Sequence, residues 1–192
     1  MSEIILRTPL KEEDLSQLRA GNQVRIYGKI YTARDAAHKK LIEMLNKQEP
    51  LPVDLVNQAI YYAGPAPAKP GYVIGPAGPT TSGRMDSYTI PLLALGLKCV
   101  IGKGVRSEEV KQGLVKFHAI YLAAVGGAAA LLSRKIKVAN VVAFPELGPE
   151  AIYELEVEGF PAIVVNDIYG NDLYQDGIKN FLENEREATD VS

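Results

Sequence analysis

The stretch LKCVIGKGVRSEEV, residues Leu97–Val110, contains in order a strand-like segment, a turn and a helix start. The apolar and β-branched residues of Lys98–Ile101 predict a buried strand. Ser107 and the two acidic residues after it predict a helix, because a hydroxyl caps free N–H groups and acids complement the helix dipole. A strand that leads directly into a helix is typical of an α/β protein.

Strand-like and helical segments alternate on both sides of this unit. Further strands are predicted at Val24–Thr32, Ala59–Tyr62, Ala119–Ala123, Val138–Ala143, Ile152–Val157 and Ala162–Val165. Helices are predicted from an Asp35 N-cap through Leu45, after Gly83, after Gly126-Gly127 and over Gln175–Glu185, with a frayed polar tail at Arg186–Ser192. No repeat and no convincing boundary interrupts the pattern, so we expect residues 1–192 to form a single α/β domain.

Composition and charge exclude several classes of protein. With 47% hydrophobic and 23% charged residues, the chain is neither disordered nor fibrous. A net charge of -2 gives no global field for a polyanion or a membrane surface, so we expect no nucleic-acid partner and no membrane partner. Cys99 is the single cysteine and no signal peptide is recognisable, so the expected compartment is cytoplasmic. One cysteine and two histidines fall short of a zinc or iron–sulfur site, so we expect no metal bound by this chain alone.

A stretch rich in glycine and proline lies between Ala63 and Arg84. One interpretation is a linker between domains. The apolar residues inside it, and the helical pattern that follows at once, favour a long ordered loop with a function. The stretch ends in Thr80-Thr81-Ser82-Gly83-Arg84, whose hydroxyls, glycine and guanidinium at a helix start suit a carboxylate or phosphate. The alternative is a capped helix with a solvent-facing arginine, and neither a P-loop nor a dinucleotide-binding motif is present.

Two more cations stand at the predicted ends of strands. Lys103 lies between two glycines after the strand that ends at Ile101, and Arg34 follows the strand that ends at Thr32. Either one taken alone is as well explained by a surface cation. Because ligands gather at the carboxyl ends of strands in α/β proteins, Arg34, Arg84 and Lys103 together predict a binding site for a small dianion.

Four other side chains are weighed against this site. His38, one helical turn after Arg34, and Asp86, just after the Thr80–Arg84 segment, are expected to support the cations from behind. Glu146 is a second acid that can orient a cation, although a cap or surface charge explains it equally well. Cys99, in an apolar strand, is expected to be buried and inert. No hydrolase motif such as G-x-S-x-G or H-E-x-x-H occurs.

Several long strings occur in a fixed order along the chain: TARDAAHKK, YYAGPAPAKPGY, GPTTSGRMDSY, GKGVRSEEV, VGGAAALL and FPELGPEAIYELEVEGFPAIVV. Together they resemble the β-subunit, or equivalently the C-terminal domain, of the class I, iron–sulfur-dependent fumarate hydratases. The resemblance extends from about Thr8 to Tyr174. The L-tartrate dehydratase β-subunit is a near relative, but GRMDSY, GKGVRS and the paired glycines are more similar to fumarase.

This resemblance implies a swivelling β/β/α domain with a mixed central sheet and flanking helices. It also implies a partner, the fumarase α-subunit, whose own cysteines bind a [4Fe-4S] cluster, in a hetero-oligomer such as a heterotetramer. In the family, the residues that match Arg34, Thr80, Arg84 and Lys103 contact the dicarboxylate, and Thr81 is the adjacent hydroxyl. The loop before Thr80, and Pro149, depart from the family pattern.

We therefore expect a hydro-lyase β-subunit, active only with its α-subunit, that reversibly hydrates fumarate to (S)-malate. Thr80, Arg84 and Lys103 are the expected catalytic residues, and Arg34 and Thr81 complete the substrate-binding set. Cations suit this reaction because negative charge develops on a carboxylate as the neighbouring carbon loses its proton. A threonine is too weak a base unless a carboxylate is coupled to it. Two alternatives remain: a dehydratase for L-tartrate or another hydroxy-dicarboxylate, and a non-catalytic dicarboxylate-binding or assembly module.

Overall fold

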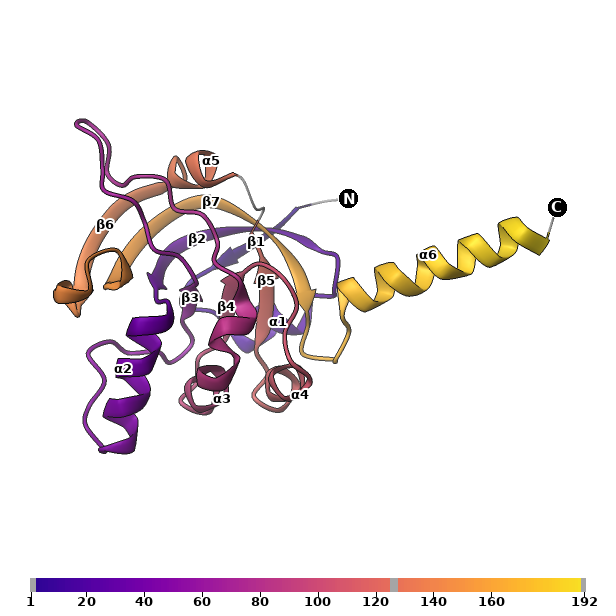
Figure 1. The fold of residues 1–192 in the computed structure, drawn as a ribbon, viewed down its shortest axis with the longest axis horizontal. Helices are drawn as coiled ribbons and strands as arrows, with labels where there is room; N and C mark the ends of the chain where they lie inside the picture. The colour runs from indigo at the N-terminus through magenta and orange to yellow at the C-terminus, as the bar shows by residue number, and fades with distance from the viewer. Residues whose placement is uncertain (1–2, 125–127, 191–192) are drawn as a thin grey trace.

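The computed structural model describes residues 3–124 and 128–190, and its centre is a mixed seven-stranded sheet (Figure 1). The strands lie in the order β1-β2-β3-β4-β5-β7-β6. They are β1 (Ile4–Arg7), β2 (Gln23–Thr32), β3 (Ala59–Tyr61), β4 (Cys99–Gly102), β5 (Ile120–Ala123), β6 (Ile136–Ala143) and β7 (Ile152–Asn166). The helices are α1 (Glu12–Ser16), α2 (Asp35–Asn46), α3 (Asp86–Ala94), α4 (Glu108–Lys116), α5 (Ala129–Ser133) and α6 (Leu173–Asp190), with 3-10 turns η1 (Ser82–Met85) and η2 (Pro145–Glu150).

Strands β1 to β5 pair in parallel with their neighbours, whereas β7 pairs antiparallel with β5, β6 and β2. Because β7 pairs with β2 as well as with β5, the pairings among β2, β3, β4, β5 and β7 close into a ring. Parallel pairing also places the carboxyl ends of β2, β3 and β4 at the same edge of the sheet. The segments that carry the predicted cations start from this edge.

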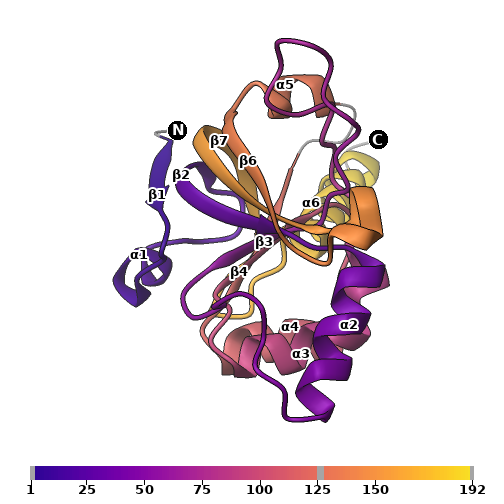
Figure 2. The ribbon, with the colours of Figure 1, turned by 90° about the vertical axis from the view of Figure 1, so that its left-hand side faces the viewer.

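Two apolar clusters form the core on the two faces of the sheet. One fills the inside of the curved sheet and includes Ile26, Ile101 and Phe160. The other lies under α2, α3 and α4, which cover the opposite face together (Figures 1 and 2). These helices bury the apolar face that their periodicity predicts, for example Leu41 of α2 and Leu114 of α4.

The strand and helix predictions are largely confirmed, with corrections at their ends. Ile152–Val157 and Ala162–Val165 are parts of one strand, β7, which continues through Gly159 at a φ of 63° opposite a register shift in β2. Glycine adopts this left-handed backbone at no steric cost, so Glu158-Gly159-Phe160 forms a β-bulge rather than a turn. Ser107 caps α4 as predicted, because its hydroxyl accepts a hydrogen bond from the Val110 N–H at 3.4 Å.

Three other predictions are corrected or fall outside the described residues. The N-cap of α2 is Arg34 and not Asp35, which is the first residue of the helix. The strand β1 and the helix α1 were not predicted, because each is too short to show a period. Gly126-Gly127 lie outside the described residues, and the helix expected after them corresponds to α5.

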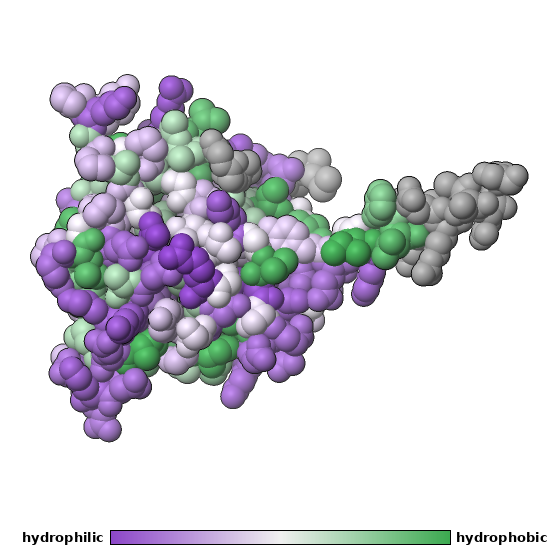
Figure 3. Space-filling view, in the orientation of Figure 1, coloured by the Kyte–Doolittle hydropathy of each residue, from purple (hydrophilic) through white to green (hydrophobic). Residues whose placement is uncertain are grey.

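The terminal helix α6 begins before the predicted Gln175 and continues to Asp190, so the prediction that the chain frays from Arg186 is wrong as far as Asp190. Residues 191–192 lie outside the described part. It extends away from the sheet (Figure 1). Exposed apolar side chains, Ile178, Phe181 and Leu182, lie on this helix, and hydrophobic surface is visible where it leaves the body (Figure 3). Among the described residues, no helix has both the length and the apolar composition needed to cross a bilayer.

Candidate active site

The Thr80–Ser82 segment pairs with the ends of β3 and β4 and continues the sheet at its carboxyl edge. The Thr80 N–H donates to the Tyr62 carbonyl at 2.6 Å, and the Lys103 N–H donates to the Thr80 carbonyl at 3.3 Å. The Ser82 N–H returns to the Lys103 carbonyl at 2.8 Å, which makes Thr81 and Lys103 partners in a parallel bridge. The structure thus brings the backbones of Thr80, Thr81 and Lys103 together at this edge of the sheet.

The glycines beside Lys103 permit this close approach. A Cβ atom on Gly102 would lie 2.0 Å from the Ser82 Oγ and 3.1 Å from a ring carbon of Tyr62, so no larger residue fits there without movement. Gly104 has a φ of 80°, in the left-handed region that favours glycine. The G-K-G sequence is therefore a packing requirement, and it leaves the Lys103 side chain exposed at the edge of the sheet.

The stretch between Ala63 and Thr80 is ordered, and its two arms pair with each other. Ala63 bridges antiparallel to Pro79, and the Ala66 N–H donates to the Pro76 carbonyl at 3.0 Å. This excursion, which we call the 64–79 hairpin, rises beside β6 and α5 in Figures 1 and 2. Its two ends return to the site, because it starts after β3 and leads directly into Thr80.

Arg34 and Arg84 meet at one carboxylate, that of Asp35. The Nε of Arg84 donates to the Asp35 Oδ1 at 2.9 Å, while an Nη of Arg34 lies 3.7 Å from Oδ2. Arg34 also lies 3.3 Å from the Glu150 carboxylate. Gly64 allows this arrangement, because a Cβ there would be 2.9 Å from the Cδ of Arg34. The predicted gathering of cations is therefore present for these two arginines, around an acid that the sequence suggested as a cap.

A second arginine–aspartate pair, which sequence reasoning missed, lies beneath these loops. Asp86 does not contact a cation of the candidate site: its Oδ1 accepts from the Nε of Arg106 at 2.7 Å and its Oδ2 from the Ser107 N–H at 2.7 Å. The Arg106 side chain is fully buried, and an Nη donates to the Thr89 hydroxyl at 2.7 Å. Burial by itself lowers the pKa of Arg106, but Tyr62 and Asp86 outweigh burial and raise the pKa above its ordinary value.

His38, which was expected to support the site cations, contacts the main chain of Arg34 one helical turn earlier. Its Nδ1 lies 2.9 Å from the Arg34 carbonyl oxygen, and because a carbonyl only accepts, Nδ1 carries the proton. The ring is fully buried between Tyr62 and Tyr88, and burial lowers the pKa of His38 to about 4. A neutral imidazole that holds the backbone at the start of α2 is a positioning group and not a proton donor at neutral pH.

Comparison with known proteins assigns the family. The sequence model described as "Fumarase C-terminus" matches residues 1–177, which is nearly the whole chain. The chain belongs to the fumarase C-terminus family. The match ends inside α6, so the fumarase C-terminus domain contains the whole sheet and every predicted site residue.

The relatives of this fumarase C-terminus domain fall into two groups by length. "Fumarate hydratase 2" of Leishmania major is 43% identical over 176 residues, which cover 90% of this chain but 31% of that protein. "Fumarate hydratase class I, aerobic" of Escherichia coli K12 is 44% identical over 174 residues, or 88% of this chain and 32% of that protein. "Putative L(+)-tartrate dehydratase subunit beta" of Methanocaldococcus jannaschii is 43% identical over 180 residues, 91% of this chain and 92% of that protein. The chain therefore spans about a third of the fumarate hydratases and nearly all of the β-subunit.

The fumarase C-terminus domain does not fit an iron–sulfur cluster by itself. Cys99 is buried in β4, and burial raises the pKa of its thiol, which disfavours the thiolate that a metal requires. In the part of the chain that the structure describes, no three His, Cys, Asp or Glu side chains are grouped so as to hold a metal ion. Glu146, the second acid considered as a partner for a cation, pairs with Lys40 at the surface.

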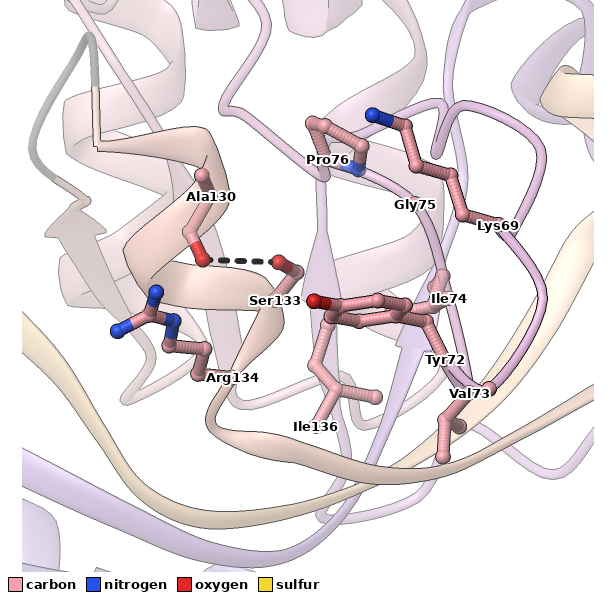
Figure 4. Close-up of a pocket in the computed structure, with 11 residues that line it drawn as sticks. Lys69, Tyr72, Val73, Ile74, Gly75, Pro76, Ala130, Ser133, Arg134 and Ile136 are labelled. Atoms are coloured by element: carbon pink, nitrogen blue, oxygen red, sulfur yellow. Dashed lines mark hydrogen bonds between the residues drawn. The ribbon is translucent and has the colours of Figure 1, made fainter.

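A pocket of about 380 Å³ between the 64–79 hairpin and α5 is separate from the candidate site (Figure 4). The hairpin contributes Tyr72 and Ile74 to its lining, and α5 contributes Ala130 and Ser133. None of the predicted substrate-binding residues lines it. The candidate site thus lies apart from this pocket, at the carboxyl edge of the sheet, where the side chains of Arg84 and Lys103 are exposed.

Proposed function

We propose that this chain is the β-subunit of a hydro-lyase that reversibly hydrates fumarate to (S)-malate, and that it supplies the cationic half of a shared active site. The convergence of Arg34 and Arg84 on the Asp35 carboxylate, beside the Thr81–Lys103 bridge, carries the proposal. A guanidinium fork matches a carboxylate in geometry as well as in charge. The two arginines that bind the Asp35 carboxylate can bind the carboxylates of a dicarboxylic acid in the same way.

The substrate-binding set is Arg34, Thr80, Thr81, Arg84 and Lys103. The Arg84 side chain is 53% exposed and that of Asp35 31% exposed, so their pair is accessible to a competing carboxylate. An exposed pair of this kind contributes only about 0 to 1 kcal/mol, which a substrate can replace with its own hydrogen bonds. Lys103, held by backbone pairing to the Thr80–Ser82 segment, adds a cation at a fixed place along the edge.

We propose that Thr80, Arg84 and Lys103 act in the chemical step. When malate loses the proton next to a carboxylate, charge builds on that carboxylate, and cations already held in place stabilise it without reorganisation. Thr80 accepts the proton only if a carboxylate is coupled to its hydroxyl. Asp35, Asp86 and Glu150 already contact Arg84, Arg106 and Arg34, so we assign that carboxylate to the partner chain.

The partner in this proposal is a fumarase α-subunit that carries the [4Fe-4S] cluster, in a hetero-oligomer such as a heterotetramer. The separate tartrate dehydratase β-subunit of M. jannaschii, which is about as long as this chain, supports a two-chain enzyme. We also propose that residues 1–192 act as one domain of the swivelling β/β/α type. The cytoplasm remains our prediction for its compartment.

A second candidate, an L-tartrate dehydratase β-subunit, rests on the same M. jannaschii relative. The two substrates share both carboxylates, so the cationic edge serves either one. Co-purification with a cluster-bearing α-chain, followed by assays with fumarate and L-tartrate at equal concentrations, separates the candidates. We expect faster turnover of fumarate, and preferential dehydration of L-tartrate would reverse the assignment.

A further inference from the structure

We propose that Arg106 is a positioning residue that holds the Thr80–Arg84 segment and the Lys103 loop in fixed relation to each other. The inference rests on the proposed function, because those two segments carry the proposed substrate-binding side chains. Arg106 itself cannot touch a substrate, since its side chain has no exposed surface. Its influence passes through Asp86, Thr89, Tyr62 and Tyr121.

The first connection leads to Thr80 through Tyr62. An Nη of Arg106 donates to the Tyr62 hydroxyl at 3.4 Å, and the guanidinium carbon lies 5.4 Å from the centre of the Tyr62 ring. The same tyrosine accepts the Thr80 N–H with its main-chain carbonyl at 2.6 Å. Displacement of the Tyr62 ring therefore changes the anchor of the residue proposed to move the proton.

The second connection leads to both loops at once through Tyr121. The guanidinium carbon of Arg106 lies 5.3 Å from the centre of this ring. The Tyr121 hydroxyl donates to the Gly104 carbonyl at 2.7 Å and accepts from the Ser82 hydroxyl at 3.0 Å. One phenol thus joins the turn after Lys103 to the segment that leads into Arg84.

The third connection leads to η1 and the start of α3. Arg106 bonds Asp86, the first residue of α3, and Thr89 one turn later. The Thr89 hydroxyl donates to the Met85 carbonyl at 2.8 Å, so its oxygen accepts from Arg106 and also from the Tyr62 hydroxyl at 3.3 Å. Arg84 directly precedes Met85, and its place in η1 depends on this set of bonds.

The geometry requires arginine and not only a positive charge. Three donors on one planar fork reach Asp86, Thr89 and Tyr62, while the same plane lies over two tyrosine rings. A lysine carries the charge but has a single nitrogen on a flexible stem, so it can keep the Asp86 ion pair without the remaining connections. Arg106→Lys therefore separates charge from geometry at this position.

The experiment compares the full chain with its Arg106→Lys variant by amide hydrogen exchange, and the reconstituted α/β complex by fumarate hydration kinetics. The diagnostic amides are those of Thr80, Ser82 and Lys103, which are hydrogen-bonded across the two segments. We expect exchange at these amides to accelerate about tenfold in Arg106→Lys, while the amides of β2 that face β7 keep their rates. In the complex we expect kcat to fall about 10²-fold with little change in KM, because misplaced groups lose transition-state contacts first.

Ile26→Val is the matched control, because Ile26 is buried in the cluster on the opposite face of the sheet. It lowers stability without touching the Arg106 network, so it accelerates exchange without selecting the three amides and leaves kcat unchanged. Unchanged exchange at Thr80, Ser82 and Lys103 in Arg106→Lys overturns the inference. Selective acceleration in Arg106→Lys, together with a wild-type complex that hydrates no fumarate, supports the positioning role of Arg106 and rejects the proposed function instead.

Discussion

Two arginine–aspartate pairs, Arg84–Asp35 (the outer pair or layer) and Arg106–Asp86 (the inner pair or layer), differ mainly in exposure. The Nε of Arg84 is 2.9 Å from Asp35 and the Nε of Arg106 is 2.7 Å from Asp86, so the contacts are nearly alike. The Arg84 side chain is 53% exposed, whereas that of Arg106 is fully buried. The outer pair is therefore accessible to a ligand from solvent, and the Arg106 side chain of the inner pair is not.

From this difference we propose that the outer pair serves activity and the inner pair serves stability. An exposed pair is screened by water and contributes about 0 to 1 kcal/mol to folding, while loss of one member of a buried pair costs about 3 to 5 kcal/mol. Substitution in the outer layer should therefore change turnover more than stability. Substitution in the inner layer should change stability, and should change turnover only through the position of the loops above.

The largest expected effect is on the inner pair. Arg106→Met leaves the Asp86 carboxylate partly buried without its cation, and we expect the free energy of unfolding to fall by about 4 kcal/mol. Urea denaturation followed by circular dichroism measures this loss. The double variant Asp86→Asn/Arg106→Met removes both charges and should recover part of it, because no unpaired ion remains.

If the double variant is no more stable than Arg106→Met, charge pairing does not explain how the Arg106–Asp86 pair stabilises the fold. A loss below about 1 kcal/mol in Arg106→Met would place this pair with ordinary surface pairs and remove the contrast on which the comparison depends.

Next in size is the effect of the outer pair on turnover. Arg84→Ala in the α/β complex should lower kcat/KM about 10²-fold, equivalent to about 3 kcal/mol of transition-state stabilisation, while the free energy of unfolding changes by less than about 1 kcal/mol. Steady-state kinetics and urea denaturation of the same preparation provide both values. Arg25→Ala is the matched control, because Arg25 is also paired with an acid, Glu3, at the surface but lies on β2. Equal kinetics in the two variants would remove Arg84 from the site.

A smaller expected effect is the pH dependence of stability that His38 causes. His38 bonds the Arg34 carbonyl, and Arg106 affects its pKa. The pKa of His38 is lowered from 6.5 to about 4, chiefly by burial and further by Arg106, while the Arg34 carbonyl and Asp35 act in the opposite direction. Between these values the unfolded chain binds a proton at His38 that the native protein excludes, so stability falls as the pH falls from 6.5 toward 4.

We expect this loss to be about 2 kcal/mol between neutral pH and pH 4.5, and to be absent above pH 6.5. His38→Asn, whose side-chain amide can still donate to the Arg34 carbonyl, should have a flatter profile over the same range. Parallel profiles for wild type and variant would show that His38 is not held neutral by burial.

The smallest effect tests how tightly the outer loop packs on β4. Gly102→Ala places a Cβ 2.0 Å from the Ser82 Oγ and forces that hydroxyl away from Tyr121, so we expect a loss of about 1 to 2 kcal/mol. Gly177→Ala on α6 is the control, because a Cβ there meets no atom within 4 Å. Thermal unfolding of the two variants decides the point, and equal midpoints would mean that the loop yields without cost.

The outer layer could be predicted from the sequence because its residues stand at the ends of periodic segments. Arg34, Lys103 and the Thr80–Arg84 segment each follow a strand or precede a helix, and parallel strands bring such ends to one edge. The Ser107 cap could be predicted for the same local reason. The location of each of these residues at the end of a strand or the start of a helix follows from its neighbours in the chain.

The inner layer could not be predicted, because its members come from four separate segments. Arg106 precedes a helix cap and is as polar as any surface residue, and nothing local indicates that Tyr62, Asp86 and Tyr121 surround it. Asp86 was expected to support the site cations because it directly follows the Thr80–Arg84 segment. It bonds instead an arginine twenty residues later in the chain. Burial of a charge is a tertiary property, and residue order alone does not contain it.

The most direct test of the central claim is the rate of fumarate hydration by the α-chain alone, by this chain alone and by the purified pair. We expect activity only from the pair, and a loss of about 10²-fold in the pair that carries Lys103→Ala, with the complex still intact by size-exclusion chromatography. Full activity of the α-chain alone, or a Lys103→Ala pair that hydrates fumarate at the wild-type rate, would contradict the claim that this chain supplies the cationic half of the active site.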